Sequence, residues 1–137
     1  MLDSYWFGEY LSNIRDSETM KGLLLKESLA DINVLDLVHI TRTESWQVSN
    51  AAEDQPTMWT ALSFEIEDSQ GDTIAVALSR ALKLQGWYIN ASTEMYVYVI
   101  FPNKVFKYLK GDSIQRESAK RHGRSMGIPE NQLDWDE

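Results

Sequence analysis

Residues 94–109, with the sequence EMYVYVIFPNKVFKYL, carry the pattern that decides the fold. β-Branched and aromatic residues fill both ends of this stretch, and Pro102 and Asn103 interrupt it near the middle. Such residues favour strands, whereas a Pro-Asn pair favours a tight turn between them. We therefore predict a hairpin of strands 94–101 and 104–109. The first strand is apolar on both faces, which is typical of a central strand covered on both sides.

The residues before this hairpin predict one more strand and a helix. Residues 87–91 extend the hairpin into an antiparallel meander, with a turn at Ser92 and Thr93. Asp72 stands where a helix cap is expected, and Gly86 stands where that helix would end. The apolar residues that recur between them at helical spacing are Ile74, Ala77, Leu78, Ala81 and Leu82.

A second hairpin is predicted in the N-terminal half of the chain. Residues 33–48 and 58–67 alternate apolar with polar side chains, as half-buried strands do. The segment between them, residues 49–56, is polar and contains a proline. We therefore expect two long strands joined by a loop.

Two further segments near the N-terminus have helical spacing. Residues 3–14 place aromatic and aliphatic residues at intervals of three and four, which predicts a short amphipathic helix. Residues 17–30 are rich in leucine and fit either of two structures. They form a helix if Ser17 caps it, or a strand from Gly22 onward, since glycine weakens the helix.

The C-terminal part of the chain predicts one more helix and a tail. Residues 112–115, Asp-Ser-Ile-Gln, match a capping box. The helix is expected to end at about Met126, because Gly127 and Pro129 follow. The last residues, 130–137, form an acidic tail.

These elements follow the order ααββαβββα, which indicates the α+β class. We predict a single α+β domain over residues 1–137. Its sheet has about five mostly antiparallel strands, with the helices packed on one face.

Composition narrows the class of protein. The chain has 137 residues, of which 43% are hydrophobic and 25% charged, as in ordinary folded domains. It contains no cysteine, which excludes disulfides and thiolate chemistry. The start of the chain lacks the features of a signal peptide, and no apolar run is long enough to span a bilayer. We expect a cytoplasmic protein, from a bacterium or phage, without a membrane partner.

Charge is divided unevenly along the chain. Residues 1–75 contain 4 basic and 14 acidic side chains, whereas residues 76–137 contain 9 and 7. The net charge of −8 makes nucleic acid an unlikely partner, because binding to phosphates requires a basic surface. Residues 104–124 are the exception, with 7 basic and 2 acidic groups.

Four tyrosines give the strongest indication of a binding surface. Tyr96 and Tyr98 lie on one face of the predicted central strand, and Tyr88 and Tyr108 lie on the strands beside it. Tyrosine-rich faces of sheets dock proteins, peptides or bases. The other interpretation is that helices cover this face and the hydroxyls reach polar partners at its edge.

The basic helix gives a second candidate. Arg116, Lys120 and Arg124 recur every four residues, which places them on one side of the helix as an anion-binding surface. An ordinary solvated helix face accounts for the same pattern. A further hypothesis is that the acidic tail folds back onto this face, with Trp135 packed beneath it and the charges neutralised internally.

Other polar residues carry less weight. Glu65 and Glu67 share a strand face and fit a metal-dependent hydrolase, although solvated carboxylates at a strand end explain them better. The only histidines, His39 and His122, lie among apolar residues and read as hydrogen-bonded core residues. We predict no metal site and no cofactor.

The sequence alone does not name a reaction, because it lacks the nucleotide-binding, zinc-protease and serine-hydrolase motifs. The leading hypothesis is a small binding protein without catalytic activity, of the inhibitor, immunity or adaptor type. It would contact a protein partner, or a second copy of itself, through the tyrosine face. The alternative is an enzyme or binder whose phosphorylated or nucleotide ligand is held by the basic C-terminal helix.

Overall fold

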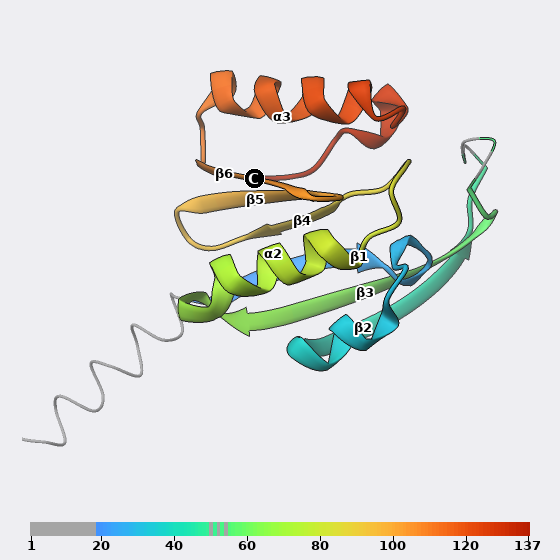
Figure 1. Ribbon diagram of the computed structural model, residues 1–137, viewed down its shortest axis with the longest axis horizontal. Coiled ribbons are helices and arrows are strands. Elements are labelled where there is room, and N and C mark those ends of the chain that lie inside the picture. The colour runs from blue at the N-terminus through green and yellow to red at the C-terminus, as the bar shows by residue number, and fades with distance from the viewer. Residues whose placement is uncertain (1–18, 50, 52, 54) are drawn as a thin grey trace, which may run out of the picture.

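The computed structural model describes residues 19–49, 51, 53 and 55–137. The helix predicted over residues 3–14 lies outside the described residues. Six strands form one antiparallel sheet, in the order β2-β3-β1-β4-β5-β6 (Figure 1). The strands are β1 (Thr19–Leu25), β2 (His39–Gln47), β3 (Met58–Glu67), β4 (Ile89–Ser92), β5 (Tyr96–Phe101) and β6 (Lys104–Leu109).

Two α-helices and four short 3-10 helices complete the described fold. The α-helices are α2 (Gly71–Ala81) and α3 (Ser113–Ser125). The 3-10 helices are η1 (Lys26–Ser28), η2 (Ile32–Leu37), η3 (Asp68–Gln70) and η4 (Glu130–Gln132). The α+β class and the antiparallel sheet are thus confirmed, with six strands where about five were predicted.

The additional strand is β1, in the segment that fitted either a helix or a strand. It lies between β3 and β4, with Leu24 opposite Leu62 and Gly22 opposite Ala91. The helical alternative for this segment is therefore wrong. A strand in the interior of a sheet gains a hydrogen-bonded neighbour on each side, which outweighs the weak local preference of the leucines for helix.

Two other boundaries differ from the prediction. The strand expected over residues 33–48 begins only at His39, because the preceding residues form η2, whose cap Asp31 accepts a hydrogen bond from the backbone of Asn33. The helix expected to reach Gly86 ends at Ala81. There the chain turns extended, and Leu82 forms an isolated β-bridge with Leu29.

Asp72 does not cap α2, because Gln70 occupies that position. The carboxylate of Asp72 instead accepts a hydrogen bond from the hydroxyl of Tyr98 at 2.6 Å and pairs with Lys107 at 3.1 Å. These two partners, Tyr98 first, lower the pKa of Asp72. The start of α2 is therefore tied to β5 and β6 through a side chain.

The two α-helices lie on opposite faces of the sheet. Alternate residues of β5 point to the two sides: Tyr98 and Ile100 belong to the core under α2, whereas Val97, Val99 and Phe101 belong to the core under α3. The double coverage of this strand is confirmed. The placement of the helices on one face is wrong, because a central strand that is apolar on both sides must be shielded on both.

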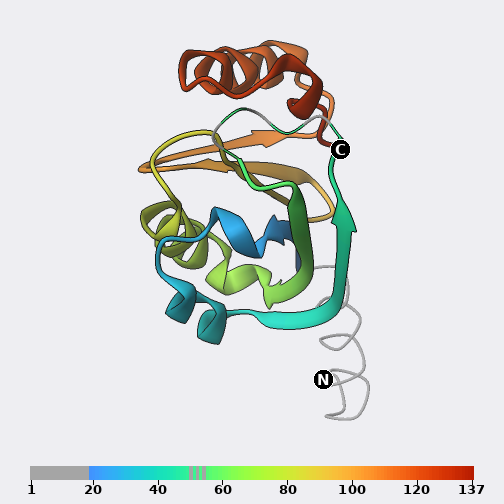
Figure 2. The same cartoon turned by 90° about the vertical axis from the view of Figure 1, so that its right-hand side faces the viewer.

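The layer on the α3 side is incomplete. In Figures 1 and 2, α3 lies over the end of the sheet that contains β5 and β6, and neither helix covers the outer side of β2 and β3. We call the side of β1, β2 and β3 that faces away from α2 the open face. Among its residues are Lys21, Leu23, Arg42, Glu44, Trp46, Ser63 and Glu65.

Gly22 sits at the closest approach between β1 and its neighbours. A Cβ atom built there would lie 2.4 Å from the ring of Phe64 and 2.7 Å from the Cβ of Ala91. Both neighbours are buried in the core under α2 and have no room to withdraw.

Replacing Gly22 with alanine is therefore expected to lower the free energy of unfolding by about 1–3 kcal/mol, as overpacking of a core does. Chemical denaturation measures the change. The matched control is Lys21→Ala at the adjacent exposed position, with an expected effect of about 0.5 kcal/mol or less. Equal stability of the Gly22→Ala protein and the wild type would contradict the close packing of β1.

Candidate functional site

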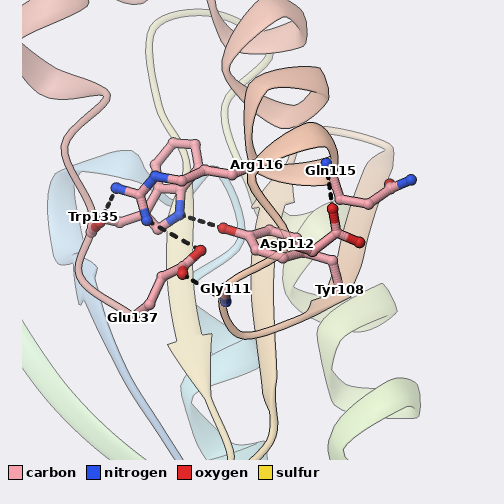
Figure 3. A network of polar contacts seen from close by, with 7 residues as sticks. All are labelled: Tyr108, Gly111, Asp112, Gln115, Arg116, Trp135 and Glu137. Atoms are coloured by element: carbon pink, nitrogen blue, oxygen red, sulfur yellow. Dashed lines mark hydrogen bonds and ion pairs between the residues drawn. The ribbon is translucent and has the colours of Figure 1, made fainter.

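The C-terminal tail packs across the end of β6 and the start of α3 (Figure 3). The indole of Trp135 is buried and donates a hydrogen bond to the hydroxyl of Tyr108 at 2.8 Å. The guanidinium of Arg116 lies over the same indole, 5.1 Å from the ring centre, and donates to the Trp135 carbonyl at 2.6 Å. Arg116 also pairs with Glu137 at 3.2 Å. The hypothesis that the tail folds back with Trp135 beneath is confirmed.

This arrangement neutralises much of the basic helix. Arg124 contacts Glu117 and Glu130, each at 2.7 Å, so both predicted anion-binding arginines already bind carboxylates of the same chain. Arg124, and to a lesser degree Lys120, lowers the pKa of Glu130. An external anion at this helix would have to displace the acidic groups that its arginines hold.

In the core between the sheet and α3, the sheet is met by large apolar side chains from the residues after α3 rather than from α3 itself. The buried positions of α3 are Ala119 and Gly123, which are small and allow a close approach to the sheet. A Cβ atom on Gly123 would lie 2.7 Å from Leu133. The residues after the helix therefore fill the space that it leaves, first Ile128 and then Leu133 and Trp135 of the tail.

Trp135→Phe should lower the free energy of unfolding by about 1–3 kcal/mol, because it removes the donor that the buried Tyr108 hydroxyl accepts from. Urea denaturation of the full chain measures it. Asp136→Asn, an exposed change in the same tail, is the control and should shift stability by about 0.5 kcal/mol or less. A neutral Trp135→Phe variant would show that the hydrogen bond between Trp135 and Tyr108 does not stabilise the fold.

The four predicted tyrosines do not form one surface. The register of β6 places Tyr108 opposite Val97, on the α3 side, whereas Tyr98 faces α2. Burial raises the pKa of both hydroxyls to about 12. Tyr88 also lies on the α3 side and donates to the Gln132 carbonyl. Tyr96 is the most accessible of the four, at 36% exposure, and lies beneath the ammonium of Lys107, whereas Tyr88 is half-buried.

Of the two interpretations of the tyrosines, the structure therefore favours the second. Other parts of the chain cover most of them and form hydrogen bonds with their hydroxyls. The sequence could not decide between the two, because alternation assigns a side only within one strand. The relative sides of Tyr98 and Tyr108 depend on how β5 and β6 are paired.

The accessible aromatic surface lies instead beside the tail. A cleft of about 280 Å³ runs between the open face and the tail; we call it the tail cleft. Its residues are Leu23, Leu24, Leu25, Trp46, Trp59, Gly86, Trp87, Tyr88, Asn90, Asn131, Gln132 and Asp134.

One side of the tail cleft is apolar. Leu23 and Trp46 are large side chains of the open face that remain 44% and 41% exposed. Below them, Trp59 packs against the buried Trp87 with ring centres 5.5 Å apart. Trp59 is fixed further, since its indole donates to the Pro56 carbonyl at 2.8 Å. Trp59, in the apolar wall, is thus held in place before anything binds.

The opposite side of the tail cleft is polar. It is built from the amides of Asn131 and Gln132, with Asp134 beside them. Gln132 is held to the loop before β3 by a reciprocal pair of amide hydrogen bonds with Gln55, and Gln55 in turn donates to the Gly86 carbonyl at 2.8 Å. The tail, the loop before β3 and the connection between α2 and β4 are thereby fixed to one another.

Sequence reasoning missed this site. Leu23 belonged to the segment that fitted either a helix or a strand, and Trp46 was counted as an ordinary residue of an alternating strand. The signal available was the number of tryptophans, five in 137 residues, because such rings are common at interfaces as well as in cores. It did not indicate which of them stay accessible.

The carboxylates and histidines of the remaining hypotheses are placed as follows. Glu65 lies opposite Lys21 on the open face, with 3.8 Å between the ammonium and the carboxylate. Glu67 lies opposite Thr19, two residues along the same strand. His39 pairs opposite Glu65 at the exposed end of β2 and is not the core residue expected from its leucine neighbours. Within the described ranges, no group of three or more acidic or histidine side chains converges as a metal site would require.

His122 packs between two aromatic rings on the inner side of α3. Its ring centre lies 4.8 Å from that of Phe101 and 5.6 Å from that of Phe106. Its Nε2 atom is buried and has no hydrogen-bond partner among the described residues, so the expectation of a hydrogen-bonded histidine is wrong for this atom. Burial, and then the nearby charge of Lys104, lowers the pKa of His122 below its usual 6.5.

This shift predicts a loss of stability in mild acid. The unfolded chain takes up the proton at about pH 6.5 and the folded chain only at lower pH, so stability is full above 6.5 and falls as the pH drops towards the folded pKa. Unfolding measured between pH 7 and 5 should show a steeper decline for the wild type than for His122→Phe. Parallel profiles of the two proteins would exclude His122 as the cause.

Comparison of the chain with known protein families, with curated proteins and with solved structures gives no match in any of the three. No helix in the described part of the chain has the length and apolar character needed to cross a membrane.

Proposed function

We propose that this protein is a small binding protein, and that it docks a segment of a partner protein in the tail cleft. The observation that carries the proposal is that Leu23 and Trp46, both well exposed, line the same cleft as the polar side chains of the tail. Large side chains that are accessible in a concave site with fixed polar groups opposite are the usual features of a recognition site. Trp46 in particular is of the residue type that most often dominates binding energy.

The lining of the tail cleft suggests what the partner segment looks like. A volume of about 280 Å³ is at the lower end of the range for ligand pockets, which favours one or two side chains over a whole cofactor. Leu23, Trp46 and Trp59 would bury an apolar or aromatic side chain. The Asp134 carboxylate and the Asn131 amide would accept hydrogen bonds from a neighbouring lysine or arginine, in keeping with the net charge of −8.

The chemistry of the polar wall supports binding rather than catalysis. The side chains of Asn131 and Gln132 are amides, which orient a ligand through hydrogen bonds and do not exchange protons near neutral pH. Among the described residues, Asp134 is the one carboxylate of the lining, and no histidine or second carboxylate lines the cleft to share acid and base roles with it. The hydroxyl of Tyr88 is already bonded to the Gln132 carbonyl, and its burial raises its pKa further above 10.

A library of random peptides displayed on phage tests the proposal. The wild-type protein should select peptides that combine an aromatic or branched aliphatic residue with an adjacent basic residue. Leu23→Asp and Trp46→Ala should each weaken the binding of a selected synthetic peptide by about tenfold or more, because they remove the apolar wall.

The matched control is Ile114→Asp, which alters an exposed apolar residue of α3 outside the tail cleft, at 78% exposure. It should bind the selected peptide as the wild type does. Circular dichroism confirms that all three variants fold. If the wild type selects no shared peptide pattern, or if the selected peptide binds Leu23→Asp with unchanged affinity, the tail cleft is not the binding site.

A further inference from the structure

Within the described part of the chain, strand β2 leaves one edge of the sheet open over nine residues. It is the terminal strand on its side, and every residue except Ile40 is exposed. Neither α-helix covers it, as Figure 2 shows for its outer side. An open edge presents backbone donors and acceptors that another strand can pair with.

The opposite edge of the sheet is protected against such pairing. Strand β6 has only six residues, and Lys104 and Lys107 lie along it. Short edges that carry lysine resist addition of a further strand. In β2 the corresponding device is a bulge at Thr41, where the register with β3 shifts between Ile40 and Arg42. The stretch after the bulge, up to Gln47, remains regular and unprotected.

The charges on this stretch are complementary to those of a second copy of itself. Arg42 and Glu44 stand on the open face, two residues apart, and their side chains are 71% and 51% exposed. They form an ion pair within the strand. In an antiparallel pair of identical strands, residues that lie opposite each other point to the same face of the sheet. The two-fold axis that relates the strands therefore lies at one residue position, which stands opposite its own copy, and the residues on either side of it stand opposite one another.

Charge selects among the possible axes. An axis at Arg42 sets arginine against arginine, and an axis at Glu44 sets glutamate against glutamate, both of which are unfavourable. An axis at Ser45 sets Glu44 against Trp46 of the second copy. Only the axis at Thr43 sets Arg42 of each copy against Glu44 of the other, which creates two favourable pairs at once.

We propose that two copies of this chain associate through antiparallel pairing of their β2 strands, centred on Thr43. The two sheets then form one continuous sheet, and the open faces of both copies lie on the same side. The inference does not depend on the tail cleft, since it rests on the backbone edge and on two charged residues outside the cleft lining.

Charge reversal tests this register by sedimentation velocity on the full chain over a series of concentrations. The wild type should dimerise. Arg42→Glu and Glu44→Arg alone should each weaken dimerisation by about tenfold or more, because each turns two attractive pairs into repulsive ones. The double variant R42E/E44R should regain wild-type dimerisation.

The decisive sample is an equimolar mixture of the two single variants. A chain with glutamate at both positions faces a chain with arginine at both, so the mixture should form a heterodimer although neither variant pairs with itself. Repair of the ion pair within one strand cannot produce this result. Lys21→Glu is the matched control, since it alters an ion pair of the same face in the sheet interior and should leave dimerisation unchanged.

A wild type that stays monomeric at every concentration would overturn the proposal. So would a dimer that Arg42→Glu leaves intact, or a mixture that remains monomeric. The peptide-binding result for Leu23→Asp, a residue of β1, is independent of these outcomes, so failure of the dimer and failure of the tail cleft can be told apart.

Discussion

The central strand β5 imposes the condition on which the rest of the structure depends. From Val97 to Phe101 every side chain is at most 1% exposed, although successive side chains point to opposite faces. Both faces of this strand must therefore be shielded from water, and no single helix can shield both. Helix α2 covers one face. On the other face the small residues of α3 let the helix lie close to the sheet, and large side chains of the tail fill the remaining space.

The incomplete second layer creates the surface on which function is proposed. Helix α3 and the tail extend over β4, β5 and β6, but the sheet continues through β1 and β3 to β2. The tail cleft lies where this coverage stops, and the free edge of β2 lies beyond it. Both proposed interaction surfaces thus follow from one geometric fact, which is that the sheet is wider than the layer that covers its outer side.

The candidate site was only partly predictable, and the failures share a physical cause. Of the three hypotheses for the basic helix, the one in which the tail folds onto it is correct; opposite charges and a tryptophan close in sequence to the helix made it accessible to sequence reasoning. The tyrosine face was not found. Pairing register decides whether Tyr98 and Tyr108 share a side, and register is fixed by contacts between strands rather than within them. The exposure of Leu23 likewise depends on what covers β1 from elsewhere in the chain.

By itself, the sequence determined the class of fold, helices α2 and α3 to within a few residues at their ends, the meander of β4 to β6 and the double coverage of β5. These features arise from local spacing of apolar residues and from capping groups, which act over a few positions along the chain. Only the tertiary structure decided that β1 is an interior strand, that the helices lie on opposite faces and that Trp46 remains accessible. Each of these depends on pairing or coverage between segments far apart in the sequence, for which a single sequence carries no periodic signal.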